Sequence, residues 1–206
     1  SSEYEQVTIF EEDYIQRTTG TVTQKPDNAL TELIANAWDA GAKEVDITIP
    51  LEEHEKIIIR DDGTGMTQDE FNHRWLTLSY NRLKNQGIDV EFPPESKGMI
   101  RKAYGRNGIG RHSMFCFSNS YHIETWKNGN CFSCDIDLSH GERPFKIYNA
   151  KVYKKEGHGT ELSTFLTQNL PDVKSITDVL SARYLFDPGF VVKINNVVVD
   201  LSKHSG

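Results

Sequence analysis

Apolar residues recur at helical spacing in the segment from residue 26 to residue 41. They are Leu30, Leu33, Ile34, Ala37 and Trp38, which share one face of a helix with 3.6 residues per turn. Pro26 suits the first turn of a helix, because the N–H group that proline lacks has no partner there, and Gly41 is a good terminator. The pattern therefore predicts one amphipathic helix between these two residues.

Other segments alternate at the period of a strand. Val45, Ile47 and Ile49 alternate with polar residues, and residues 57–59 form an apolar run typical of a more buried strand. Further strands are predicted at 121–126, 130–138, 145–154, 160–165, 190–194 and 197–201, with hairpin turns at Asn128-Gly129 and Asn195-Asn196. Additional helices are predicted at 11–17, 68–76, 111–117 and 173–184. Helices mixed with largely antiparallel strands indicate an α+β sandwich, in which helices cover one face of the sheet.

Length and charge limit the classes of protein that fit this chain. Its 206 residues suit a single domain spanning 1–206, and a net charge of −7 argues against nucleic-acid binding as its main role. Nucleic acid is expected to bind only through other domains. Five basic residues do cluster near a glycine-containing stretch: Lys97, Arg101, Lys102, Arg106 and Arg111. A phosphate ligand accounts for them at least as well as DNA does.

The sequence carries no signal for membrane insertion or secretion. No apolar run approaches the roughly 20 residues of a membrane span, and the first residues lack the pattern of a signal peptide. The odd number of cysteines, Cys116, Cys131 and Cys134, disfavours a disulfide framework, and a lone Cys-x-x-Cys pair is a weak metal motif. We expect a cytoplasmic protein that does not contact a membrane.

A polar stripe runs along the helix predicted after Pro26. Glu32, Asn36 and Asp39 lie at positions i, i+4 and i+7 and share one face. A helix built only for solubility usually pairs its acids with Lys or Arg four residues later, and Glu32 has Asn36 at that position. The stripe therefore indicates a binding or catalytic site.

A glycine-rich stretch precedes the helix predicted at 111–117. It consists of Gly105, Arg106, Asn107, Gly108, Ile109 and Gly110. Glycines let backbone N–H groups approach an anion, and a following helix N-terminus adds partial positive charge. The stretch matches neither the dinucleotide fingerprint nor the Walker loop, so a simple turn is the alternative reading of this motif alone.

A second glycine motif follows the strand predicted at 57–59. Asp61, Gly63, Gly65 and Met66 place a carboxylate at a strand end beside backbone that can approach a flat ligand. An ionised Asp only accepts hydrogen bonds, so it can receive one from an exocyclic amino group such as that of adenine. A calcium loop is the alternative, but the further oxygen ligands of an EF-hand are missing. The turn at 157–159 before Thr160 adds a hydroxyl.

These four motifs, in this order, resemble the GHKL superfamily of ATPases, which includes DNA gyrase, the heat-shock-90-type chaperones, the histidine kinases and MutL. The nucleotide pocket of that superfamily is the Bergerat fold, a two-layer sandwich of a mixed, mostly antiparallel sheet and helices. The resemblance covers residues 26–166. The sequence from Glu32 to Ala42 is most similar to the MutL, chaperone and MORC-like branches.

The resemblance implies a role for each matching residue. Glu32 would be the general base that polarises the attacking water, and Asn36 would coordinate Mg²⁺. Asp61 would hold the adenine amino group, with help from Thr160. Four further groups would complete the pocket: Asp39, Ala40 and Lys43 near the sugar and phosphates, Gly63, Gly65 and Met66 near the base, Lys97 in the lid, and Gly105 to Gly110 around the phosphates.

The resemblance also implies an activity and a partner. It predicts Mg²⁺-dependent ATP binding and hydrolysis, slow in the isolated domain, with a lid at 77–104 that closes on ATP and drives dimerisation of a larger protein. MutL-type and gyrase-type enzymes complete the site with a lysine from a following domain, so an N-terminal fragment or a naturally minimal module is expected. The alternatives are a nucleotide-sensing module with little turnover and the catalytic domain of a histidine kinase.

Overall fold

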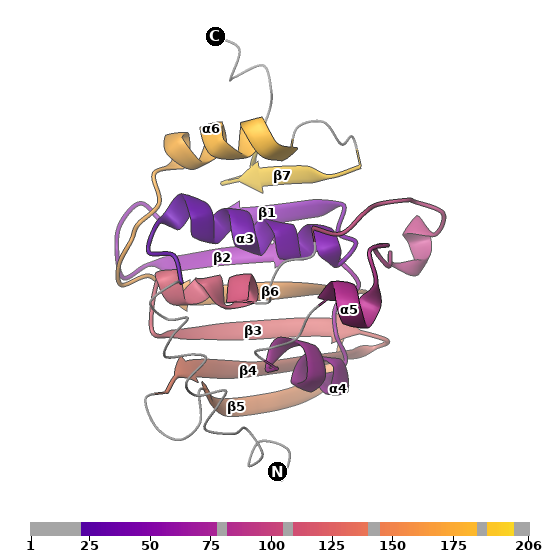
Figure 1. Cartoon of the computed structure of the whole chain (residues 1–206). Helices are drawn as coiled ribbons and strands as arrows, with labels where there is room; N and C mark the ends of the chain where they lie inside the picture. The colour runs from indigo at the N-terminus through magenta and orange to yellow at the C-terminus, as the bar shows by residue number, and fades with distance from the viewer. Residues whose placement is uncertain (1–21, 78–81, 105–108, 140–144, 185–188, 200–206) are drawn as a thin grey trace.

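A computed structural model describes residues 22–77, 82–104, 109–139, 145–184 and 189–199. The helices and helical turns are α3 (Pro26–Asp39), α4 (Gln68–Glu70), η1 (Phe71–Trp75), α5 (Arg82–Gln86), η2 (Pro94–Ser96), η3 (Ile109–Cys116) and α6 (Val173–Tyr184). The strands are β1 (Glu44–Thr48), β2 (Lys56–Asp61), β3 (Ser120–Lys127), β4 (Asn130–Leu138), β5 (Phe145–Lys154), β6 (Gly159–Phe165), β7 (Val191–Ile194) and β8 (Val197–Val198). The labelled helices lie on one face of one sheet (Figure 1), which confirms the predicted α+β sandwich.

The sheet has eight strands in the order β5-β4-β3-β6-β2-β1-β7-β8. All neighbouring pairs are antiparallel except β1 and β7, which run parallel. The order places β6 between β2 and β3 although it follows them by many residues in the chain. Residues at the ends of these three strands therefore meet, and they form the floor of a pocket under α3.

The helix α3 packs the predicted apolar stripe against the sheet. Leu30, Leu33 and Ile34 are at most 2% exposed, whereas Glu32 and Asn36 on the adjacent face keep partial exposure. The helix begins at Pro26 as predicted, and the backbone continues through Gly41 with a positive φ of 75°. A side chain at Gly41 would also overlap the backbone of Glu91, so both the backbone conformation and the limited space favour glycine at the end of α3.

Two predicted helices differ in type from the expectation. The segment predicted at 68–76 starts as α4, capped by the Thr67 hydroxyl, and widens into the π-helical turn η1. The segment predicted at 111–117 is the 3₁₀ helix η3. Such variants occur frequently beside functional sites, and apolar spacing alone does not separate them from an α-helix. The helix predicted at 11–17 lies outside the described residues.

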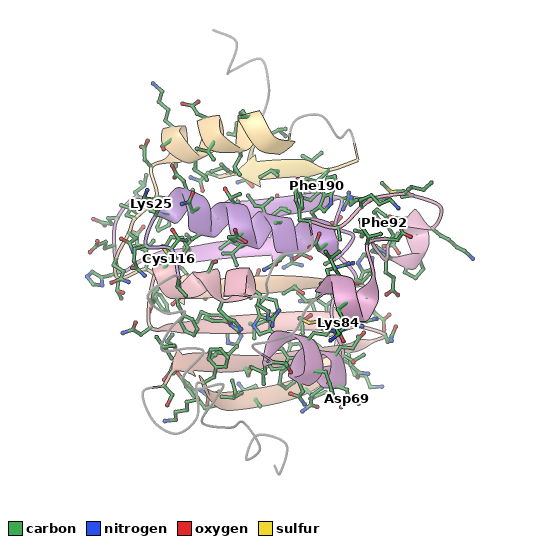
Figure 2. The ribbon with its side chains drawn as sticks, viewed as in Figure 1. Lys25, Asp69, Lys84, Phe92, Cys116 and Phe190 are labelled. Carbon is green, nitrogen blue, oxygen red and sulfur yellow. The ribbon has the colours of Figure 1, made fainter. Side chains whose placement is uncertain are left out.

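The second half of the predicted lid is anchored to the rest of the domain. Arg101 is only 4% exposed and donates hydrogen bonds to the carbonyl oxygens of Trp38 (3.0 Å), Ala42 (2.8 Å) and Gly189 (3.2 Å). Its guanidinium also stacks near the rings of Trp38, Phe92 and Phe190. Figure 2 shows Phe92 and Phe190 close to the end of α3. Arg101 is therefore part of the core, and the prediction that it joins a phosphate-binding patch is wrong.

Replacing Arg101 with Met should destabilise the domain by about 3 kcal/mol or more. The variant leaves the carbonyl oxygens of Trp38, Ala42 and Gly189, which are buried or partly buried, without this donor, and each such loss costs roughly 1–3 kcal/mol. The matched control is Lys102→Met, because the ion pair between Lys102 and Asp89 is mostly exposed and should contribute less than about 1 kcal/mol. Urea unfolding of both variants measures the difference, and equal stabilities would contradict the anchoring role.

Candidate functional site

One pocket lies between α3, the sheet and the segments that follow β2. Its lining includes Leu33, Asn36, Asp39, Ala40, Ile59, Asp61, Thr64, Gly65, Met66, Arg74, Trp75, Arg82, Gln86, Glu91, Gly110, Arg111, Thr160 and Leu162. The helix stripe, the Asp61 motif, the end of the glycine stretch and Thr160 thus meet in one cavity. Sequence positions more than 120 residues apart contribute to it, since Asn36 and Thr160 both line the wall.

Asp61 is the carboxylate at the floor of the pocket. Desolvation inside the pocket raises its pKa to about 7, although the hydrogen bond from the Gly63 N–H to Oδ1 (2.8 Å) acts in the opposite direction. A carboxyl group held near its ionisation point at neutral pH in a pocket is typical of a binding or catalytic group.

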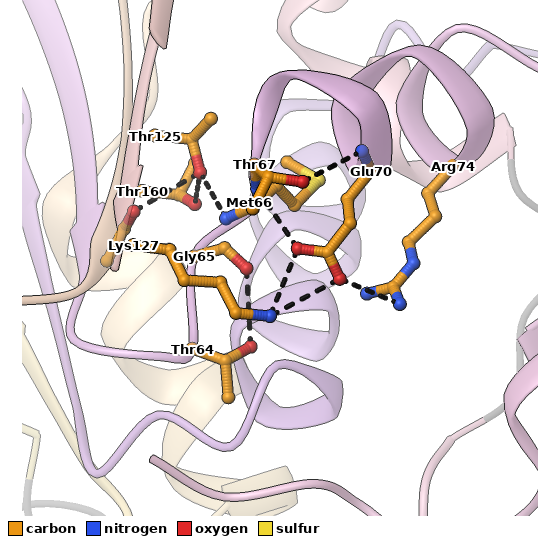
Figure 3. Close-up of polar contacts among 10 residues, drawn as sticks. Thr64, Gly65, Met66, Thr67, Glu70, Arg74, Thr125, Lys127 and Thr160 are labelled. Atoms are coloured by element: carbon orange, nitrogen blue, oxygen red, sulfur yellow. Dashed lines mark hydrogen bonds and ion pairs between the residues drawn. The ribbon is translucent and has the colours of Figure 1, made fainter. Parts of the chain in front are cut away.

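Three neighbouring strands place polar side chains in one row beside Asp61. Asp61 pairs with Thr160 across β2 and β6, and Thr160 pairs with Thr125 across β6 and β3. Paired residues of adjacent strands share a face of the sheet, so the three side chains lie together. Figure 3 shows the Thr125 hydroxyl bonded to Thr160 (3.0 Å) and to the backbone N–H of Met66 (2.9 Å). The predicted residues Met66 and Thr160 are thus joined through Thr125. Thr125 itself was not among the predicted site residues.

Gly65 is required by the close approach of two strands' ends. It has a positive φ of 68°, and a Cβ there would overlap the carbonyl oxygen of Trp126. Gly63 is restricted differently, because a Cβ would meet Ala40 and the Asp61 carboxylate. Both predicted glycines therefore let the backbone of the Asp61 loop lie against the neighbouring elements.

The glutamate of α3 and the end of the glycine stretch lie against each other. A Cβ on Gly110 would overlap the Glu32 carboxylate, so glycine at this position leaves room for that group. Gly110 lines the pocket, and so does Asn36, which lies one turn of α3 after Glu32. Ile109 opens η3, while Gly105, Arg106, Asn107 and Gly108 lie outside the described residues.

Two adjacent acids at the end of β2 have separate roles. Asp61 faces the pocket, whereas the Asp62 carboxylate accepts the backbone N–H groups of Lys43 (2.7 Å) and Glu44 (2.9 Å). Asp62 therefore fixes the start of β1. The Asp-x-Gly-x-Gly spacing pointed to Asp61 as the pocket residue, and its position agrees with that choice.

The other predicted site residues divide between the pocket and the surface. Asp39 lines the pocket, and its side chain accepts the Tyr104 N–H (2.7 Å) while its carbonyl accepts a bond from Arg82 (3.1 Å). Ala40 lines the pocket as well. Lys43 and Lys97 are exposed and do not belong to the described lining, so the structure does not bring these two lysines to the site.

Two arginines also line the pocket: Arg111, which belongs to the basic cluster of the sequence, and Arg74, which no motif indicates. Arg111 donates to the carbonyl oxygens of Trp75 (3.1 Å) and Thr77, and so joins η3 to the end of η1. Arg74 bonds Glu70 (2.9 Å), which also bonds Lys127 (3.0 Å), as Figure 3 shows. Desolvation raises the pKa of Glu70, but the Thr67 N–H and Lys127 outweigh it and leave the pKa below its usual value.

The Asn36 amide is the group in the described pocket that could hold a metal ion. The buried Nδ2 atom of the Asn36 amide has no hydrogen-bond partner within the described ranges, and amide nitrogen and oxygen are assigned only from such bonds. Mg²⁺ usually binds one or two protein groups together with phosphates and waters, without a cage of carboxylates. No group of three or more His, Cys, Asp or Glu side chains suited to a metal occurs in the described parts of the chain.

The sheet order, the covering helices and this pocket define a two-layer α+β domain with a pocket between helix α3 and a mixed sheet (Figure 1). The model of the family "histidine kinase-, DNA gyrase B-, and HSP90-like ATPase" matches residues 24–164, and the chain belongs to that family. This match confirms the resemblance found in the motifs.

Individual relatives match over different lengths. The putative type II restriction enzyme HgiDII of Herpetosiphon aurantiacus is 32% identical over 140 residues, which are 68% of this chain and 19% of that protein. The DNA mismatch repair protein MutL of Rhodopseudomonas palustris is 39% identical over 72 residues, 35% of this chain and 11% of that protein. The chain therefore spans about a fifth or less of these relatives.

A solved structure shares the fold. The ATPase region of Saccharomyces cerevisiae topoisomerase II aligns with 87% of this chain and 50% of its own, with a TM-score of 0.61 and 16% identity. None of the helices in the described residues has the length and apolar character needed to cross a membrane.

Proposed function

We propose that this domain binds ATP with Mg²⁺ and hydrolyses it. The observation that carries the proposal is that Asp61, Asn36 and Gly110 line one pocket, with Glu32 packed against Gly110. Those residues come from the three motifs that the family uses for base, metal and phosphates. Family membership supports ATP as the nucleotide.

The floor of the pocket would bind the base. An ionised Asp61 would accept a hydrogen bond from the exocyclic amino group of adenine, and Thr160 would add a hydroxyl beside it. Met66, Ile59 and Leu162 line the same region and would supply apolar contact to the ring. The position of Asp61 at the end of β2 keeps this group fixed, because a strand of a sheet sets it.

The α3 side of the pocket would carry out the chemistry. Glu32 would act as the general base that orients and deprotonates water, since its carboxylate lies at the end of the glycine stretch. The Asn36 amide would hold Mg²⁺ on the phosphates. When bound, the ion would neutralise phosphate charge during in-line attack. Gly110 would present its backbone N–H to the same phosphates.

Calorimetry and a phosphate-release assay test the proposal directly. The wild-type domain should bind ADP more tightly with Mg²⁺ than with EDTA, and it should release phosphate from ATP slowly. Binding without any turnover would favour the alternative, a nucleotide-sensing module. If neither ATP nor ADP binds, the proposed function is wrong.

We infer further that 77–104 closes over ATP and that closure helps a larger protein to dimerise. The contacts of the described residues indicate which part of the segment 77–104 would move. Val90 and Ala103 are tied by backbone hydrogen bonds to Arg101 (3.0 Å) and Ile88 (2.7 Å), whereas the short helix α5 has no buried residue. We expect α5 to move more than the anchored segment 88–103.

Hydrogen exchange with and without a non-hydrolysable ATP analogue checks this inference. The analogue should slow the exchange of amides in residues 82–87, because a bound triphosphate would draw the lid toward the pocket. Amides in 88–103 should be protected in both states and serve as the internal control. Equal protection of 82–87 in both states would show that α5 is not part of a lid.

A further inference from the structure

We propose that His158 is a positioning residue for base recognition, which links Glu95 of η2 to the Gly63 carbonyl and so fixes the loop that carries Asp61. The inference rests on the proposed function, because it concerns the adenine end of the same pocket. His158 lies in the turn before β6 and is not one of the residues that line the pocket.

Two contacts define this linkage, which we call the His158 clasp. The Nδ1 atom of His158 lies 2.6 Å from the Gly63 carbonyl oxygen, and its Nε2 atom contacts the Glu95 carboxylate. A carbonyl oxygen and a carboxylate only accept hydrogen bonds, so both ring nitrogens must carry a proton. The two partners therefore select the imidazolium form of His158.

The clasp reaches Asp61 through a single residue. His158 donates to the carbonyl of Gly63, while the N–H of Gly63 donates to Asp61 Oδ1 (2.8 Å). The next N–H, that of Thr64, donates to the Ala40 carbonyl (2.8 Å). The peptide planes on both sides of Gly63 are thus held, which matters because glycine alone restrains its backbone weakly.

The charges around His158 favour an ionised Asp61. Burial lowers the pKa of His158, but the Glu95 carboxylate and the Gly63 carbonyl more than offset this and raise it overall. In turn, the positive charge of His158 lowers the pKa of Asp61, against the effects of desolvation and of Asp62. The hydrogen bond from His158 lowers the pKa of Glu95, and the charge of Lys43 acts in the same direction. An ionised Asp61 accepts a stronger hydrogen bond from an amino group.

The affinity for ADP between pH 5.5 and 9 tests the clasp. In the wild type, affinity should rise as Asp61 ionises and fall again as His158 loses its proton. His158→Gln should weaken binding about five- to tenfold at neutral pH, in line with one charge-assisted hydrogen bond. This variant should also lose the alkaline fall, and its acidic rise should move to higher pH. Glu95→Gln should move the alkaline fall to lower pH.

The matched control is His122→Gln. His122 is also a partly exposed histidine bonded to a carboxylate, Asp135 (2.8 Å), but it lies on β3 away from the pocket lining. Its variant should keep the wild-type profile. A purely structural role for His158 would lower affinity equally at every pH.

A measurement without nucleotide completes the test. The imidazole signals of His158 in an NMR pH titration should shift to a lower pKa in Glu95→Gln, because the variant removes the anionic partner. An unchanged titration, or a His158→Gln variant with the wild-type ADP profile, would overturn the clasp while leaving the proposed function intact. Failure of the wild type to bind ADP would overturn both.

Discussion

Changing Glu32 to Gln should reduce ATP turnover by about 10² or more and leave the affinity for ADP within a few-fold of wild type. A general base typically contributes 10²–10⁴ to the rate, and the amide cannot take a proton from water. Glutamine keeps the shape of the group that packs against Gly110, so the fold of the site is preserved. Glu32→Ala should show the same loss of turnover.

The control for this result is Glu53→Ala, which removes an exposed carboxylate from the turn between β1 and β2. Its turnover and affinity should match the wild type. Loss of ADP binding in Glu32→Gln, with turnover unchanged at saturating ATP, would make Glu32 a structural residue.

Asp61→Asn should weaken ADP binding roughly tenfold to hundredfold, since one buried charge-assisted hydrogen bond is worth about 1.5–3 kcal/mol. Calorimetry at pH 8, where the wild-type carboxyl group is ionised, gives the clearest comparison. Unchanged affinity would refute the proposal that Asp61 binds the adenine base.

The same variant should stabilise the nucleotide-free domain. The pKa of Asp61 is about 7 in the folded protein and 3.8 for an aspartate in water, so the folded state holds a proton that the unfolded state releases between these pH values. The contribution of Asp61 to stability is therefore complete below about pH 4 and is lost as pH rises to 7. Asp61→Asn should remove this loss and be more stable than wild type at pH 8 by about 2 kcal/mol.

Thermal or urea unfolding at pH 5 and pH 8 measures the effect. The difference between variant and wild type should be larger at pH 8, and other titrating groups cancel in the comparison. A difference that is the same at both pH values would show that Asp61 is not desolvated. Weaker binding together with higher stability would mark Asp61 as a residue kept for ligand recognition.

Much of the architecture could be predicted because it depends on local periodicity. The stripe on α3, the alternation in β1 and the hairpin at Asn128-Gly129 follow from spacing and turn chemistry within short windows. The same holds for Asp61 and Gly65, whose motif fixed their place at a strand end. Family membership confirmed the combination of motifs.

The remaining features depend on contacts that no short window contains. Arg101 is basic and stands between Ile100 and Lys102, yet the aromatic rings of Trp38, Phe92 and Phe190 surround its guanidinium, and two of these residues are more than 60 positions away in the sequence. Thr125 reaches the site only because β3 pairs with β6, which in turn pairs with β2 and so brings Thr125 beside Thr160. Lys43 and Lys97 carry the right charge for phosphates, but their backbone positions leave both side chains exposed. Charge and propensity do not encode which distant elements become neighbours.

The placement of the three tryptophans gives the domain an optical reporter of its own site. Trp75 lines the pocket and donates to the buried Tyr121 hydroxyl (2.9 Å), whereas Trp38 stacks on Arg101 and Trp126 lies beneath Arg60 and Lys155. A ligand bound in the pocket would change the polarity around the Trp75 indole, and the two cation-flanked indoles would supply a steadier background. Intrinsic fluorescence of the unlabelled protein should therefore follow occupancy of the site in real time, and Trp75→Phe should remove the signal.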